Sequence, residues 1–454
     1  MQLPAAFQEA MKIQLGGVYG EFEQALSTPP SVSIRSHVLK SNIRKENSDG
    51  VKWNNKGVYL SERPIFTLDP AFHAGAYYVQ EASSMFVAEA VRQIGASQEG
   101  RGLKVLDLCA APGGKSTLLL DELPADSFLL SNEVIKNRFQ ILKYNLIKWG
   151  CPAVAASQLD STRLSPLTGF FDIVLVDAPC SGEGLFRKTP DAMNEWSPDN
   201  VQLCAARQKR ILAEAMPLVK PGGYLIYCTC TYNKQENEEN AAWISQTDDF
   251  EHFPLSIPTE WGILPRTMGY QFYPHRVRGE GFYLACFQRQ SAPSTTDKRK
   301  KRRSPQGLVA VSKKERLTLS EWIDDPEAYF FFKDKHEAIR ALPATHSPTA
   351  EQLYQHWPYL FMGLEVGTIK GKDFVPAPSL ALSTTVHPQL PRLALDLPQA
   401  LAYLRKETME GLGSIPRGWQ LVTYEGLGLG WLKGLGNRYN NYYPKDWRIR
   451  MKSR

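Results

Sequence analysis

The chain has 454 residues, of which 43% are hydrophobic, 11% aromatic and 22% charged, and its formal net charge is +6. That length exceeds what one hydrophobic core usually sustains, and that composition excludes a largely disordered chain, so we expect two or more folded domains. The seven cysteines match neither a disulfide framework nor a paired zinc-ligand pattern, which favours reduced thiols. The mild basic excess suits a polyanionic partner but does not require one.

The N-terminus shows no secretory signal. It reads MQLPAAFQEAMK, without the basic stretch and apolar run of a signal peptide, and no apolar segment of the sequence is long enough to span a bilayer. We therefore expect a cytoplasmic protein without a membrane partner. By default we expect a monomer.

Residues 1–80 predict a small α+β unit packed on the domain that follows. Apolar residues at helical spacing from Phe7 to Leu26 indicate an amphipathic helix, and SVSIR is typical of a short strand. Residues 81–290 alternate apolar strand runs (GLKVLDL, DSFLLSNE, FDIVLVDAP, GGYLIYCTC) with helical stretches (SSMFVAEAVRQI, KNRFQILKYNLIKW, CAARQKRILAEAMPLV). This alternation predicts an α/β domain with a doubly wound, Rossmann-like parallel sheet.

The rest of the chain divides into a linker and an appended region. Residues 291–307 are rich in Ser, Thr, Pro, Lys and Arg, so we expect a basic flexible linker that cannot bury enough apolar surface to fold. Residues 308–454 are aromatic-rich with several short strand signals. They predict one or two small α+β or β-barrel domains.

A glycine turn connects the strand GLKVLDL to a helix and lets the backbone approach a ligand closely. Its spacing fits neither a phosphate loop nor a dinucleotide fingerprint, which disfavours a phosphate cofactor, and the carboxylates after the next strands favour a nucleoside. Glu133 ends the second strand, where its carboxylate can accept hydrogen bonds from ribose hydroxyls, and Asp160 follows the third, within reach of an adenine amino group. Both would otherwise be solvated strand-end carboxylates. The predicted contacts of the turn are Cys109, Ala110, Ala111, Pro112, Gly113, Gly114 and Lys115.

Two cysteines follow neighbouring strands, Cys180 after FDIVLVD and Cys230 at the end of YLIYCTC. Ligands bind at the carboxyl ends of an open parallel sheet, so both thiols face one crevice. A thiolate that adds to carbon 6 of cytosine makes carbon 5 nucleophilic enough to take a methyl group. Asp177 can donate or share a proton at ring nitrogen 3. The spacing does not decide which thiol attacks.

The remaining cysteines have a simpler interpretation. Cys228 would share a face with Cys230 if the strand continued through both. The CxC pair has no cluster of Cys or His nearby, so we expect no metal. We expect the other five cysteines to be inert and to pack like small apolar residues: Cys109, Cys151, Cys204, Cys228 and Cys286.

Four motifs resemble those of the Sun/Fmu-type RNA (cytosine-5) methyltransferases: DLCAAPGGKS, SNEVIKNR, VDAPCSGEGLFRK and YCTCTYNKQENEE. The segments FRKTPDAMNEW and NYYPKDWR are similar to the subgroup of ribosomal RNA small-subunit methyltransferase F (RsmF-like). The resemblance covers nearly the whole chain. It implies S-adenosylmethionine as the cofactor and a PUA-like RNA-binding module at the C-terminus.

The resemblance also implies roles for individual residues. The attacking cysteine of the family matches Cys230, and the cysteine that releases the product matches Cys180. DNA cytosine methyltransferases instead attack with the cysteine of their proline-cysteine motif, which would give that role to Cys180. The family tends to show an Arg-x-Asn segment before a Lys, where this chain reads SIRSHVLK and has His37. The methyl-donor site matches residues 109–115 with Glu133, Asp160 and Asp177.

Several cations are candidates for RNA contact. Arg187 and Lys188 follow the Cys180 loop and can hold a phosphate near a flipped base. The run at 298–303 can add nonspecific attraction to RNA, or simply keep a linker soluble. The C-terminal ending interleaves aromatics with cations, which suits base stacking but also a small barrel core. The candidates there are Arg438, Tyr443, Lys445 and Arg448.

The sequence therefore predicts an enzyme that methylates carbon 5 of cytosine in RNA. By resemblance the substrate is small-subunit ribosomal RNA, either free or in the assembled subunit. Three alternatives remain: methylation of transfer RNA, methylation of DNA, and a ribosome-assembly factor that binds RNA without catalysis. Fold-level analogy does not choose between them. Methyl incorporation into RNA versus DNA distinguishes the first two classes.

Overall fold

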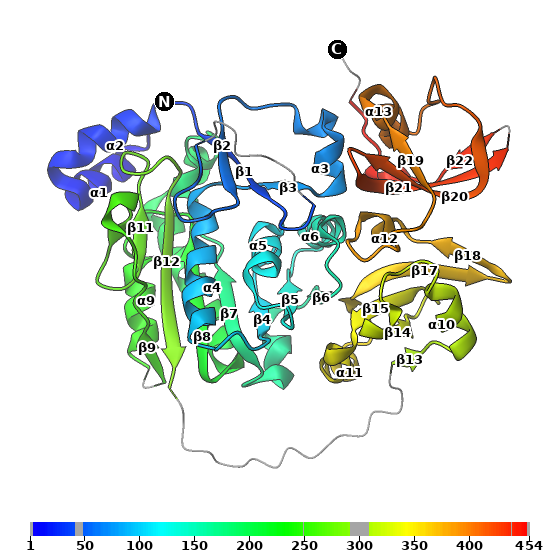
Figure 1. Cartoon of the computed structure of the whole chain (residues 1–454). Helices are drawn as coiled ribbons and strands as arrows, with labels where there is room; N and C mark the ends of the chain where they lie inside the picture. Colours follow the sequence, from blue (N-terminus) through cyan, green and yellow to red (C-terminus); the bar gives the residue numbers. More distant parts are fainter. Residues whose placement is uncertain (1–2, 41–48, 248, 291–307, 437, 452–454) are drawn as a thin grey trace, which may run out of the picture.

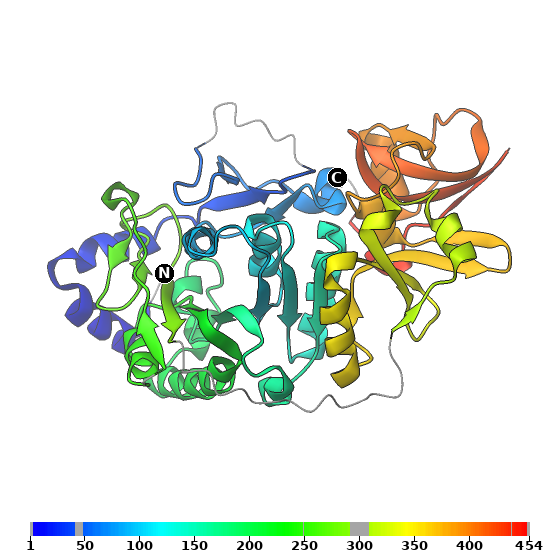
Figure 2. The same cartoon turned by 60° about the horizontal axis from the view of Figure 1, so that its bottom comes forward.

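The computed structural model describes residues 3–40, 49–247, 249–290, 308–436 and 438–451. The predicted linker at 291–307, with the basic run at 298–303, lies outside the described residues. Figures 1 and 2 show a catalytic domain with the first two helices at one side and the C-terminal region at the other. Among the described residues, no helix is both long and apolar enough to cross a membrane.

A ten-stranded sheet forms the centre of the catalytic domain, with the order β10-β11-β12-β8-β7-β4-β5-β6-β16 and β9 beside β12. The pairs among β4 to β8 are parallel, whereas β12 runs antiparallel to β8. The strands are β4 (Lys104–Asp107), β5 (Phe128–Asn132), β6 (Val154–Ser157), β7 (Phe171–Asp177), β8 (Val219–Thr229), β9 (Phe250–His252), β10 (Leu264–Pro265), β11 (Tyr270–Phe272), β12 (Phe282–Arg289) and β16 (Phe361–Met362).

Both faces of this sheet are buried. Val105 and Ile173 lie in one hydrophobic cluster with α4, α5 and α6, while their neighbours Leu106 and Val174 lie in a second cluster with α8 and α9. Strands covered on both faces read as continuous apolar runs, which is why the sequence reveals them. The doubly wound, Rossmann-like α/β fold is thereby confirmed. The helices are α4 (Val87–Ala96), α5 (Gly114–Glu122), α6 (Lys136–Trp149), α7 (Ala192–Glu195), α8 (Pro198–Ala215) and α9 (Glu238–Ser245).

The N-terminal unit combines three helices with a three-stranded sheet of order β2-β1-β3. Phe7 and Phe22 of the first two helices pack against Phe186 and Tyr232 of the catalytic domain. This contact anchors the unit beside the loops that follow β7 and β8. Its elements are α1 (Ala5–Leu15), α2 (Tyr19–Leu26), β1 (Val32–Ser36), β2 (Gly57–Leu60), α3 (Pro70–Ala74) and β3 (Tyr77–Val79).

The C-terminal region forms two sheets, of order β13-β14-β15-β17-β18 and β19-β20-β21-β22. It also lends β16 to the edge of the catalytic sheet, where β16 pairs with β6. The second sheet packs on α3, and Trp447 contacts Tyr144 of α6. The elements are β13 (Val309–Ala310), α10 (Lys313–Leu319), β14 (Tyr329–Lys333), β15 (Ile339–Pro343), α11 (Ser347–His356), β17 (Leu364–Lys370), β18 (Asp373–Pro376), α12 (Pro378–Leu382), β19 (Arg392–Leu395), α13 (Leu397–Arg405), β20 (Ile415–Tyr424), β21 (Leu427–Gly436) and β22 (Tyr439–Asn441).

Candidate active site

The glycine turn between β4 and α5 is held in place by two side chains of α6. Gly113 has φ +110, a left-handed conformation that glycine adopts without strain. From α6, Arg138 donates a hydrogen bond to the carbonyl of Ala111 (2.7 Å) and Asn145 donates one to the carbonyl of Pro112 (2.8 Å). Residues of the turn line two cavities, Cys109 the first and residues from Ala110 to Lys115 the second.

The first cavity, of about 350 Å³, is lined by Cys109, Glu133 and Asp160, with Arg207 and Arg210 from α8. Glu133 is buried and accepts a hydrogen bond from the backbone N–H of Ile135 (2.8 Å). The Asp160 side chain also accepts from the backbone N–H and the hydroxyl of Thr162, and these bonds lower its pKa. Both predicted carboxylates thus line one cavity beside the turn, as a nucleoside cofactor requires.

Asp107, at the end of β4, is a buried carboxyl to which the sequence assigned no role. Its Oδ2 accepts from the hydroxyl of Ser116 (2.6 Å), while its Oδ1 has no hydrogen-bond partner in the described part of the chain. Burial raises the pKa of Asp107 to about 7. Its position at a strand end before the turn is the one sequence signal that could have singled it out.

The second cavity, of about 340 Å³, lies on the other side of the turn and is lined by Asp177, Cys230 and Lys115. The Lys115 ammonium lies 2.7 Å from Asp177 Oδ2. Burial is the largest single influence and lowers the pKa of Lys115, but Asp177 together with Cys228 and Cys230 outweighs it, so the net pKa lies above its ordinary value. Below, we call this space the cysteine cavity.

The two predicted cysteines meet at this cavity. The sulfur atoms of Cys180 and Cys230 are 3.0 Å apart, and the backbone N–H of Cys230 points to Cys180 Sγ (3.4 Å). The hydrogen bond with Cys230, together with burial, raises the pKa of Cys180 well above its ordinary value, which keeps Cys180 a thiol. Of the two, Cys230 is the one that lines the cavity.

Cys228 does not share this position. β8 ends at Thr229, so the strand does not continue through Cys230 as a common face would require. Cys228 is buried, and its thiol lies 3.5 Å from Asp177 Oδ1. Burial raises the pKa of all five thiols that we expected to be inert, which are Cys109, Cys151, Cys204, Cys228 and Cys286.

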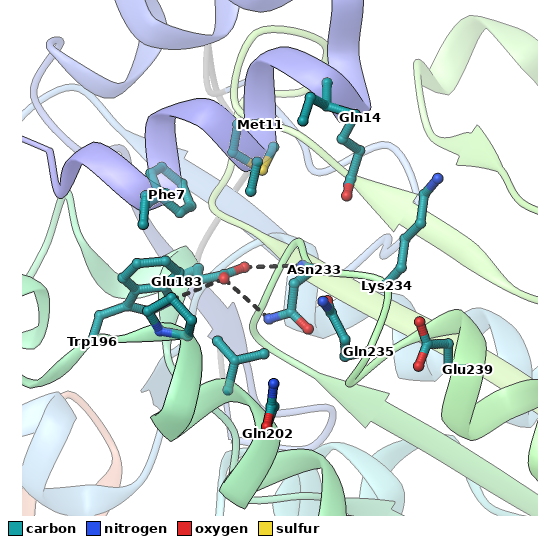
Figure 3. Close-up of a pocket in the computed structure, with 15 residues that line it drawn as sticks. Phe7, Met11, Gln14, Glu183, Trp196, Gln202, Asn233, Lys234, Gln235 and Glu239 are labelled. Carbon is teal, nitrogen blue, oxygen red and sulfur yellow. Dashed lines mark hydrogen bonds between the residues drawn. The ribbon is translucent and has the colours of Figure 1, made fainter.

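Two buried carboxylates join the cysteine loops, and neither is among the predicted site residues. Glu183, from the Cys180 loop, accepts hydrogen bonds on one oxygen from the Thr231 hydroxyl and the backbone N–H groups of Tyr232 and Asn233. Its other oxygen accepts from Trp196 and from the Asn233 side chain, as Figure 3 shows beside a cavity under α1.

Glu236, from the Cys230 loop, makes the reverse connection. One of its oxygens accepts from the backbone N–H of Ser181 (3.0 Å) and from Gln208 (2.7 Å), and the other from the Asn233 side chain (2.7 Å). Glu183 of the Cys180 loop is thus held by donors of the Cys230 loop, and Glu236 of the Cys230 loop is tied back to the Cys180 loop through Ser181. This reciprocal pair, Glu183 and Glu236, fixes the two sulfur atoms relative to each other.

The structure corrects two of the predicted RNA contacts. The Arg187 guanidinium is buried, bidentate on Glu280 (2.9 and 3.0 Å) and bonded to the carbonyl of Gly279, so its donors are used inside the protein. Tyr443 is buried against Tyr403 in the core of the C-terminal sheet, so its ring is not free to stack on a base. The exposed predicted cations are Lys188, Arg438, Lys445 and Arg448.

His37 takes an internal position. It is buried, its Nδ1 accepts from the backbone N–H groups of Leu39 and Lys40, and its Nε2 contacts the carbonyl of Trp149 (3.1 Å). Burial, helped by Lys40, lowers its pKa to about 3. Among the described residues, no group of three or more His, Cys, Asp or Glu is placed to hold a metal ion.

The sheet order, the glycine turn after β4 and the carboxylates after β5, β6 and β7 define a Rossmann-like methyltransferase. Three family models match in chain order: the N-terminal domain of 16S rRNA methyltransferase RsmF (residues 3–82), 16S rRNA methyltransferase RsmB/F (96–288) and the methyltransferase RsmF PUA domain (391–449). Residues 96–288 match the RsmB/F methyltransferase family, and the three matches together confirm the resemblance of the motifs and the PUA-like domain.

Curated relatives are similar along the whole chain. The ribosomal RNA small subunit methyltransferase F of Aliivibrio fischeri is 29% identical, covering 98% of this chain and 97% of that protein, and that of Shewanella loihica is 27% identical, covering 94% and 91%. Among solved structures, a methyltransferase homologue from Pyrococcus horikoshii is 27% identical with a TM-score of 0.53, covering 63% of this chain and 94% of its own. NSun6 from the same organism, solved with SFG, shares the fold at 19% identity (TM-score 0.53, covering 64% and 99%).

Proposed function

We propose that this methyltransferase transfers a methyl group from S-adenosylmethionine to carbon 5 of cytosine in RNA, with small-subunit ribosomal RNA as the substrate. The observation that carries the proposal is the pair of sulfur atoms, Cys180 and Cys230, 3.0 Å apart at a cavity that adjoins the cofactor turn. Two thiols at this place have a use in methylating a ring carbon that is too weak a nucleophile by itself. The names of the curated relatives support ribosomal RNA.

The residues around the first cavity fit S-adenosylmethionine. Glu133 would accept from the ribose hydroxyls and Asp160 would lie near the adenine in the first cavity. The turn at residues 109–115 would lie along the methionine part, since Cys109 lines the first cavity and Ala110, Ala111, Pro112, Gly114 and Lys115 line the second. Asp177, on the far side of the turn, would face the methyl-bearing end. When bound, the cofactor supplies an electrophilic methyl group. The buried Glu133 carboxylate, which has acceptor capacity left beside the cavity, is the observation that supports this fit.

The cysteine cavity has the groups that the reaction needs. Cys230 Sγ gives up its proton and forms a bond to carbon 6 of cytosine, while ring nitrogen 3 takes up a proton passed on through the Asp177 and Lys115 pair, so no net proton is gained or lost. After carbon 5 has gained the methyl group, its proton leaves to a base, the bond from Cys230 to carbon 6 breaks, and nitrogen 3 returns its proton. Cys180, within contact distance of Cys230, is placed to assist this release.

The test compares wild type, Cys180→Ala and Cys230→Ala with labelled S-adenosylmethionine and unmodified small-subunit RNA. We expect Cys180→Ala to accumulate a protein-RNA adduct under denaturing conditions, whereas Cys230→Ala gives neither adduct nor methylated RNA. An adduct formed by Cys230→Ala but lost in Cys180→Ala would reverse the two roles. Parallel reactions with transfer RNA and DNA define the substrate, and a wild-type protein that methylates none of them would favour an RNA-binding assembly factor.

A further inference from the structure

A further cavity, larger than the cysteine cavity, adjoins it. It measures about 570 Å³ and shares Tyr78 and Val79 with the cysteine cavity as lining residues. It lies where the N-terminal unit meets α6, and α3 beside it also contacts the C-terminal sheet (Figure 1). An RNA strand that passes over the cysteine cavity would therefore meet this space next. Its charged and aromatic lining residues are Arg63, Phe66, Phe72, Tyr78 and Lys148.

Lys148 is a buried cation without an anionic partner. It is 3% exposed, its ammonium lies 3.6 Å from the centroid of the Phe72 ring and 5.4 Å from that of Tyr144, and it forms no ion pair with the described residues. Burial lowers its pKa to about 7. A buried charge without a partner is costly, and an anion entering the cavity would remove that cost.

The walls of the cavity supply rings and a second cation. The Phe66 and Phe72 rings lie 6.3 Å apart, and the Arg63 guanidinium lies 5.5 Å from the Phe66 centroid. Arg63 is exposed at the rim and forms no ion pair in the described part of the chain, and no carboxylate lines the cavity. Aromatic faces among unpaired cations, without acidic residues, are typical of sites where unstacked bases and their phosphates bind.

We propose that this cavity binds the nucleotide next to the target cytosine, with its base against Phe66 and Phe72 and its phosphate between Lys148 and Arg63. The inference rests on the proposed function, because it takes the target base to occupy the cysteine cavity. A base that leaves its stack must be extruded from a strand whose neighbouring nucleotides are held. This cavity holds such a neighbour.

The test uses Lys148→Met, which keeps an unbranched apolar side chain of nearly the same length without the ammonium, and Arg63→Gln at the exposed rim, where folding is not at risk. The matched control is Lys209→Met, an equal charge change at an exposed position of α8 that lines neither cavity. With an unmodified small-subunit RNA transcript, we expect KM to rise about tenfold in Lys148→Met and about threefold in Arg63→Gln, with kcat within about twofold of wild type. The control leaves both constants unchanged.

Fluorescence anisotropy with a labelled single-stranded RNA 12-mer, titrated with salt, separates this inference from the proposed function. Loss of one phosphate contact lowers the slope of log affinity against log salt by about 1. Equal slopes and KM values in wild type, Lys148→Met and Arg63→Gln would overturn the inference while methyl transfer by wild type stands. Absence of methyl transfer, with a lower slope in the two variants, would overturn the proposed function and keep the RNA site.

Discussion

The buried carboxylates near the two cysteines have hydrogen-bond donors around them, whereas the buried ammonium of Lys148 has no anionic partner among the described residues. Glu183 accepts hydrogen bonds from five donors and Glu236 from three, so every oxygen of the two carboxylates has a donor inside the protein. Lys148, by contrast, has aromatic rings around its ammonium and no ion pair among the described residues. A satisfied charge fixes geometry, whereas an unsatisfied one leaves a place for a ligand. The comparison separates residues that position the cysteines from residues that bind.

The largest effect is expected for Glu183→Gln. The amide keeps the shape but replaces one acceptor oxygen with an N–H₂ group, so either the donors at Thr231, Tyr232 and Asn233 or those at Trp196 and the Asn233 side chain lose their acceptor. The Cys230 loop then shifts, and we expect kcat to fall on the order of 100-fold while the KM for RNA changes little. Single-turnover methyl transfer measures this. Glu195→Gln, an exposed carboxylate on α7, is the control.

The proposed positioning role of Glu183 can be contradicted by one result. If Glu183→Gln raised the KM for RNA and left kcat intact, Glu183 would act in binding rather than in positioning Cys230. Thermal unfolding of the same variant distinguishes a local shift from general loss of the fold.

Arg187→Met gives the next largest effect and contrasts with Lys148→Met. Removal of the guanidinium leaves the Glu280 carboxylate buried and unpaired, so we expect a loss of about 3–5 kcal/mol in the free energy of unfolding. The salt dependence of RNA binding should not change, because the guanidinium donors are occupied within the protein. Denaturant unfolding and the salt titration measure the two quantities. If the variant lowered the dependence of RNA affinity on salt and left stability unchanged, Arg187 would contact a phosphate, as the sequence predicts.

Most of the fold could be predicted from the sequence because its parallel strands are buried on both faces and stand out as apolar runs. The glycine turn, Glu133, Asp160 and the two cysteines could be predicted for a related reason, since strand ends of one sheet meet at one edge. Hydrogen bonds between segments that are distant in the sequence could not be predicted. Glu183 lies 48 residues from Thr231, and nothing in that spacing shows that the two residues are bonded.

The wrong expectations for Arg187 and Tyr443 have the same origin. The partner of Arg187 is Glu280, which is 93 residues further along the chain, and a cation that follows a catalytic loop looks the same in sequence whether it is paired or free. Tyr443 lies in a tail of alternating aromatics and cations, and only the packing against Tyr403 shows which rings face the core. The edge strand β16, supplied to the catalytic sheet by the C-terminal region, is equally invisible in its two residues.

The smallest effect concerns His37, which lies beside Lys40 near the region around Lys148. Its imidazole stays uncharged. Its folded pKa of about 3 lies below the ordinary value of 6.5, because burial and Lys40 disfavour the imidazolium. The unfolded state therefore binds the proton first, so this contribution to stability is fully present above pH 6.5 and is lost as the pH falls toward 3. In His37→Asn, the side-chain oxygen can accept from the same backbone N–H groups of Leu39 and Lys40 without titrating.

We expect His37→Asn to be less stable than wild type by about 1 kcal/mol at pH 8, because the contact with the Trp149 carbonyl is lost. This difference should shrink or reverse at pH 4.5, where wild type bears the cost of keeping the imidazole neutral. Unfolding of both proteins at the two pH values measures it, and the other histidines cancel in the difference. A difference that stays constant with pH would show that His37 is not held neutral, and that the region around Lys148 and Lys40 already contains enough negative charge to accept another cation.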